Sequence, residues 1–188
     1  MTRARCACLA LLTAAVLGAC AGVPEPADAD AIAARVQAVG IAPELVYVTD
    51  LDGFDLATQS AGVFGNDGMS ATYTRTGGDG FASVTLTTSR TTDPQPDQAP
   101  VPCADLDDAD GATLACEVER GDALVRLDAE GVDAATLRAA GEAVRVPGTG
   151  ELDEVFADVP AEIGPPVERG DLPQEGDGAP VDPPGAGG

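Results

Sequence analysis

Two stretches of the chain alternate apolar side chains with hydroxyl-bearing or charged ones at a period of two, which is typical of β-strands with one buried face. The first stretch, Met69–Thr74 and Ala82–Thr87, is interrupted by the glycine-rich Thr76–Gly80 and predicts a hairpin whose outer face is a ladder of Ser and Thr. The second stretch pairs Thr113–Glu119 with Leu124–Leu127 across a short turn. We therefore expect a sheet with one apolar and one polar face.

Apolar residues recur three and four positions apart in other segments, which predicts helices. The first helix runs from a cap at Asp28 or Asp30 to about Val39, and the second runs from a cap at Asp133 to about Val146. The residues expected on the buried faces are Ile32, Val36 and Val39 of the first helix and Leu137, Ala140 and Val144 of the second.

The remaining segments complete one predicted domain over residues 28–159. Glu44–Thr49 is predicted to be a strand and Thr91–Asp110 a loop, and Thr149 is expected to cap a last short helix. Together these elements predict an α+β fold, with an antiparallel sheet of four to six strands and the first and penultimate helices packed on one face. Residues 160–188 are rich in Pro, Gly and acids, so we expect a disordered acidic tail.

The first twenty residues have the organisation of an export signal. Arg3 and Arg5 precede a short apolar run that ends in Leu17-Gly18-Ala19-Cys20. This ending resembles the lipobox of bacterial lipoproteins, and the Ala-, Gly- and Asp-rich composition without Lys resembles that of an actinobacterial protein. The resemblance implies that residues 1–19 are removed, that Cys20 carries the lipid, and that residues 20–27 tether the domain to the extracytoplasmic face of the cell membrane. The alternatives are an ordinary signal peptide cut nearby, or a buried apolar helix.

The charge of the chain excludes one large class of partners. Removal of residues 1–19 takes away two Arg and no acid, so the formal charge moves from -22 to about -24. Nucleic-acid binding requires clustered Lys and Arg, and the sequence has no such cluster. The same charge opposes adhesion to an anionic membrane surface, so the lipid would have to hold the domain there.

Two cysteines remain in the predicted domain. Cys103 and Cys116 form an isolated pair, which in an exported protein is most simply a disulfide; a redox or metal-binding thiol pair is the alternative. Asp105, Asp107 and Asp110 are weak candidates for a cation site, because the acidic loop around them departs from the EF-hand pattern in its register. We therefore predict no resident metal and no cofactor.

Several catalytic chemistries are excluded by composition. The chain has no His and no Lys, which removes His-based nucleophile activation, imidazole metal sites, Schiff bases and P-loops. We therefore expect no enzymatic activity. The expected function is that of a lipid-anchored accessory or interaction domain of the cell envelope, with an unidentified envelope protein or ligand as partner. The alternative is a lipoprotein that binds a small or apolar ligand in a cavity between sheet and helices, and a carboxylate enzyme is a third, weaker hypothesis.

Overall fold

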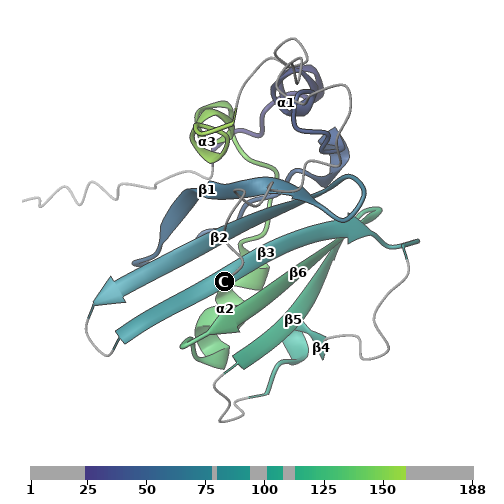
Figure 1. Cartoon of the computed structure of the whole chain (residues 1–188). Helices are drawn as coiled ribbons and strands as arrows, with labels where there is room; N and C mark the ends of the chain where they lie inside the picture. Colours follow the sequence, from purple (N-terminus) through teal and green to yellow (C-terminus); the bar gives the residue numbers. More distant parts are fainter. Residues whose placement is uncertain (1–23, 78–79, 94–100, 108–112, 160–188) are drawn as a thin grey trace, which may run out of the picture.

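The computed structural model describes residues 24–77, 80–93, 101–107 and 113–159, and it has an α+β fold (Figure 1). Six strands form one sheet in the order β1-β2-β3-β6-β5-β4. The strands are β1 (Asp55–Phe64), β2 (Gly68–Gly77), β3 (Gly80–Arg90), β4 (Val101–Pro102), β5 (Thr113–Arg120) and β6 (Ala123–Glu130). The helices are α1 (Ala29–Val36), α2 (Ala134–Glu142) and α3 (Thr149–Val155), with short 3-10 turns η1 (Pro43–Leu45) and η2 (Cys103–Asp105).

Both predicted hairpins are present, and their alternation builds the sheet. β2 pairs with β3, β3 with β6 and β5 with β6, all antiparallel. The side chains that face the helices are apolar apart from Thr88, and nearly all of them are buried; they are Met69, Ala71, Tyr73, Ala82, Val84, Leu86, Leu114, Cys116, Val125, Leu127 and Ala129. On the opposite face, the Oγ1 atoms of Thr72 and Thr85 lie 3.1 Å apart in the predicted hydroxyl ladder.

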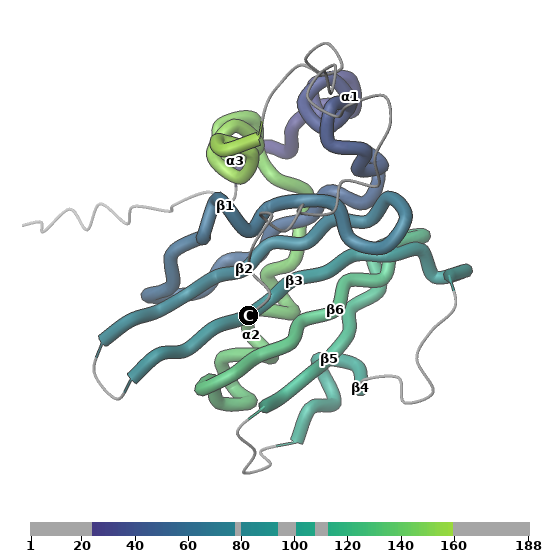
Figure 2. Tube along the Cα trace, viewed as in Figure 1, coloured from purple at the N-terminus to yellow at the C-terminus, as the bar shows by residue number. Residues whose placement is uncertain are grey.

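All three helices cover the same face of the sheet. Met69 and Ala71 of β2 belong to a cluster with residues of α1 and α3, whereas Tyr73 of the same strand face belongs to a cluster with residues of α2. Figures 1 and 2 show α1, from the start of the described chain, beside α3, from its end. Arg35 of α1 joins the two helices, because its guanidinium donates to the carbonyl of Phe156 and stacks over that ring.

The helices begin where the sequence predicts and end earlier. Asp28 and Asp133 accept hydrogen bonds from the backbone N–H groups of Ala31 and Thr136 and so cap α1 and α2. α2 ends at Glu142 instead of near Val146, because the backbone of Arg145 pairs with that of Val48. α3 is capped by Gly148, whose N–H donates to Glu151, rather than by Thr149.

The prediction of a strand over Glu44–Thr49 was wrong. The segment starts as η1, and the carbonyl of Leu45 accepts a hydrogen bond of 2.8 Å from the buried Thr88 hydroxyl instead of joining a ladder. The edge strand next to β2 is β1, which the sequence reasoning missed. Its pairing with β2 shifts register between Ala57 and Gly62, and this irregularity breaks the alternation by which a strand is recognised.

The sheet is mixed, whereas the sequence analysis predicted an antiparallel sheet. Within the predicted loop Thr91–Asp110, the two-residue β4 pairs with β5 in parallel, Val101 opposite Cys116. η2 follows β4 directly and lies against β5 and α2. This short parallel edge places Cys103 next to its partner cysteine.

The predicted signal sequence and tail, residues 1–19 and 160–188, lie outside the described residues, as does Cys20. None of the helices in the part of the chain that the structure describes has the length and hydrophobicity needed to cross a bilayer.

Candidate functional site

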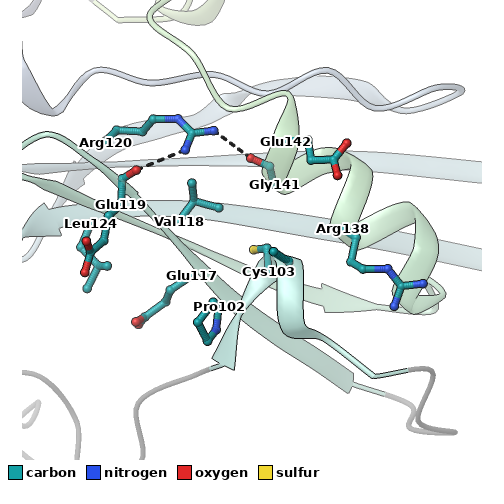
Figure 3. A pocket seen from close by; sticks show the side chains of 11 residues that line it. Pro102, Cys103, Glu117, Val118, Glu119, Arg120, Leu124, Arg138, Gly141 and Glu142 are labelled. Atoms are coloured by element: carbon teal, nitrogen blue, oxygen red, sulfur yellow. Dashed lines mark hydrogen bonds between the residues drawn. The ribbon is translucent and has the colours of Figure 1, made fainter.

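A groove of about 550 Å³ runs along the β4 side of the sheet, between β5, η2 and the C-terminal end of α2. Figure 3 shows its centre formed by Val118, Cys103 and Pro102, with Glu117 and Glu119 to one side and helix α2 to the other. Leu124 of β6 extends the apolar surface past Glu119. The groove is therefore an open surface feature at the end of the sheet and does not lie within the core.

The disulfide forms part of the floor of the groove. The sulfur atoms of Cys103 and Cys116 lie 2.06 Å apart and the Cα atoms 4.7 Å apart, so the predicted pair is at disulfide distance. Both cysteines are buried. Gly141 of α2 lies directly over the bridge, where a Cβ atom would come within 2.6 Å of the Cβ of Cys103. The bridge and this close helix approach together fix the width of the groove.

The two arginines of the groove are used to hold its walls. Arg120 donates through Nε to the carbonyl of Val144 at 3.0 Å, and through its terminal nitrogens to the carbonyls of Gly141 and Glu119, both at 3.1 Å. It thus donates to the carbonyl of Gly141 in the last turn of α2 and to that of Val144 just beyond the helix. Arg138 donates to the carbonyl of Leu106, beyond η2. Both guanidinium groups thus donate hydrogen bonds to backbone carbonyls of this chain.

Three carboxylates line the groove as well: Glu117, Glu119 and Glu142. Among the described residues, none of the three forms an ion pair or accepts a hydrogen bond. Partial burial raises the pKa of Glu117, and the positive charge of Arg126, its cross-strand neighbour, partly offsets that effect. Glu142 stands in the last turn of α2, where a negative charge opposes the helix dipole.

This arrangement suits recognition better than catalysis. The groove offers an apolar floor, arginine donors already bound to carbonyls, and carboxylate acceptors without protein partners. Such a set can hold a group that is apolar in one part and cationic in another. Its two sulfur atoms are joined in the bridge, so neither is a thiolate nucleophile.

The weak candidates for a cation site are not brought together within the described residues. Asp105 and Asp107 are exposed, and Asp110 lies outside the described part of the chain. No group of three or more His, Cys, Asp or Glu side chains within the described ranges could hold a metal ion. The described residues therefore give no structural support to a cation site at Asp105 and Asp107.

A second polar depression of about 440 Å³ lies near α3, and two of its lining acids, Asp50 and Glu151, are bound by Arg145. Arg145 donates to Asp50 at 3.0 Å and forms a close ion pair with Glu151, and its side chain is only 16% exposed. The second helix was predicted to run to about Val146 and so to include Arg145, but Arg145 lies beyond the end of α2. Tyr73 lies beneath, with its hydroxyl accepting from the N–H of Thr49; burial raises its pKa to about 12. This network stabilises the fold and leaves its cation fully paired.

Sequence reasoning found the disulfide and missed the groove. The signal that could have found it is the run Glu117-Val118-Glu119, an alternation of acid and valine on a predicted strand next to a cysteine. The position of that run at the edge of the sheet, with α2 above it, depends on tertiary contacts. Comparison with known proteins adds no assignment, since no family model, curated protein or solved structure matches the chain.

Proposed function

We propose that this chain is a lipid-anchored, extracytoplasmic protein of the cell envelope that acts as a non-catalytic interaction domain. The anchor is inferred from the sequence, in which Leu17-Gly18-Ala19-Cys20 follows a short apolar run. The paired cysteines support an oxidising, extracytoplasmic location, because such bridges persist outside the cytosol.

The observation that carries the interaction role is the surface groove on a domain whose interior is filled. Side chains of β2, β3, β5 and β6 form one core cluster with Leu137 and Ala140 of α2 and with Val144 just after it. A ligand held between sheet and helix would have to displace these buried groups. The groove, in contrast, is open and presents carboxylates that the described residues leave unpaired.

The anchor is tested by metabolic labelling with an alkyne fatty acid, followed by membrane fractionation. We expect Cys20→Ala to abolish both labelling and membrane retention, because Cys20 would be the only acylated thiol. Cys6→Ala is the matched control, since residue 6 would be removed with the signal and its loss should change neither result. Retention of unlabelled Cys20→Ala in membranes would contradict the proposal.

The interaction role is tested by photo-crosslinking in native membranes, with the photoreactive group at exposed Ala104 beside the groove and, as control, at Ala157 after α3. Capture of a defined protein from Ala104 and not from Ala157 supports the role. Capture of lipid alone from both positions contradicts it.

Small-ligand binding remains the second candidate, because about 550 Å³ falls in the range of small-molecule pockets. It predicts a small organic molecule released on denaturation of the purified protein and detected by mass spectrometry. The interaction role predicts none.

A further inference from the structure

The carboxylates that line the groove have a regular spacing along β5. Glu117 and Glu119 are two residues apart, so their side chains project from the same face of the strand about 7 Å apart, while Val118 between them projects from the other face. An extended peptide has the same repeat along its own backbone. The groove therefore matches, in spacing, an extended chain with like side chains at alternate positions.

The groove has carboxylates without an ionic partner among the described residues, so positive charge on a ligand would complement it. Arg120 and Arg138 already donate to carbonyls of this chain, and Arg138 has further contacts. Glu117, Glu119 and Glu142 make no ion pair among the described residues, and Arg126, the cross-strand neighbour of Glu117, is paired with Asp128. A partner with basic side chains complements the three carboxylates, and the net charge of -22 on the whole chain favours its approach.

The apolar floor limits the choice further. Val118, on the α2 side of β5, and Pro102 present hydrocarbon to the groove, so the partner side chain that points to this side should be aliphatic. The backbone edge of β5 is not free for continuous strand pairing. The two-residue β4 covers Cys116 and Glu117, and Arg120 occupies the carbonyl of Glu119. The partner is consequently held mainly by its side chains.

From this geometry we infer, on the basis of the interaction role proposed above, that the groove binds an extended basic–aliphatic–basic peptide segment of a partner protein. Its two basic side chains face Glu117 and Glu119, and its aliphatic side chain enters between Val118 and α2, beside Glu142. This occupancy explains why α2 carries an acid in a turn where the helix dipole disfavours one.

The probe is a fluorescein-labelled hexapeptide of alternating arginine and leucine, measured by fluorescence anisotropy with the full chain in non-ionic detergent at low salt. The comparison peptides are a block sequence of three arginines and three leucines, and an alternating glutamate–leucine peptide. We expect the alternating arginine peptide to bind most tightly. Equal binding of the block sequence overturns the inference, because the spacing would then be irrelevant, and so does equal binding of the glutamate peptide.

The matched variants separate the groove from the overall charge. The triple variant Glu117→Gln, Glu119→Gln and Glu142→Gln should weaken binding about tenfold, as expected for three exposed ion pairs. Asp30→Asn, Asp153→Asn and Glu154→Gln remove the same charge from α1 and α3, whose residues are exposed there, and should have little effect. Equal weakening by both triple variants overturns the inference, because attraction would then be unspecific.

A second variant tests the groove sterically. Ala104→Arg introduces a long basic side chain at an exposed position of its wall and should abolish binding with an unchanged thermal midpoint. Undiminished binding overturns the inference, as does self-association through this surface, detected as dimers by sedimentation that Ala104→Arg dissociates. Failure of the peptide to bind, with partner capture from Ala104 intact, would reject this peptide class and leave the interaction role standing.

Discussion

At the scale of single residues, the approach of Gly141 to the disulfide is a tight steric constraint at the groove. A Cβ atom at this position would lie 2.6 Å from the Cβ of Cys103 and 2.9 Å from its Sγ, which is closer than such atoms tolerate. Glycine is otherwise unfavourable inside a helix by about 1 kcal/mol relative to alanine. Its presence in α2 is therefore explained by packing against the bridge.

This approach predicts opposite results for two glycine-to-alanine substitutions in helices. Gly141→Ala should destabilise the domain by about 1–3 kcal/mol, because the helix or η2 must shift. Gly150→Ala in α3 meets no atom within 4 Å and should be neutral or slightly stabilising. Urea unfolding of both variants provides the measurement. A Gly141→Ala domain as stable as the parent would show that η2 yields without cost.

At the scale of elements, the segment before β1, the segment after α2 and the start of α3 are joined by a charged network. Arg145 follows α2 and binds Asp50 and Glu151, while Glu151 also accepts from the N–H of Gly148. Hydrogen bonding from Arg145 holds the pKa of Glu151 below its usual value of 4.5. Because the carboxylate is favoured in the folded state, its contribution is complete above that pH and is lost as the pH falls through the lowered pKa.

The network predicts a pH-dependent effect of one substitution. Glu151→Gln keeps an oxygen for the N–H of Gly148 but removes the charge, so it should cost about 1 kcal/mol at pH 7. The difference from the parent should shrink as the pH falls through the lowered pKa of Glu151, where the parent side chain itself becomes protonated. Glu154→Gln, an exposed position on the same helix, is the control. Chemical unfolding at pH 7 and pH 3 measures both, and a difference independent of pH would contradict the assignment.

At the scale of the whole molecule, the disulfide connects the otherwise short β4 edge to the body of the sheet. β4 has only two residues and pairs in parallel with β5, so it contributes few ladder bonds of its own. The cross-link between positions 103 and 116, with a sequence separation of 13, holds this edge below α2. The wall of the groove formed by η2 depends on the same link.

Removal of the cross-link should therefore lower global stability. Cys103→Ala/Cys116→Ala should lose up to about 3 kcal/mol, the loop-closure contribution expected for a loop of this length. Reduction of the parent with dithiothreitol should have a similar effect, and the reductant should not change the double variant further. Cys20→Ala serves as the control, because residue 20 precedes the domain. Calorimetry measures the change, and an unshifted midpoint after complete reduction would contradict the structural role.

The sequence was a good guide where periodicity is local and a poor one where pairing is long-range. The hairpins of Met69–Thr87 and Thr113–Leu127 follow from alternation and turn glycines, and the caps Asp28 and Asp133 follow from side-chain chemistry. β1 was missed because its pairing contains a register shift, and β4 was missed because two residues carry no periodic signal. The end of α2 was misplaced because the backbone of Arg145 pairs with a residue almost a hundred positions away.

The sequence by itself determined the α+β class, the polar and apolar faces of the sheet, the cysteine pair and the strongly acidic charge, because these depend on local pattern and composition. Only the tertiary structure decided the strand order, the parallel edge and the groove. The groove requires β5, η2 and α2 to meet, and their contact depends on packing around Gly141 and on the carbonyls that Arg120 satisfies. Such contacts join residues distant in the chain, so no local sequence pattern reveals them.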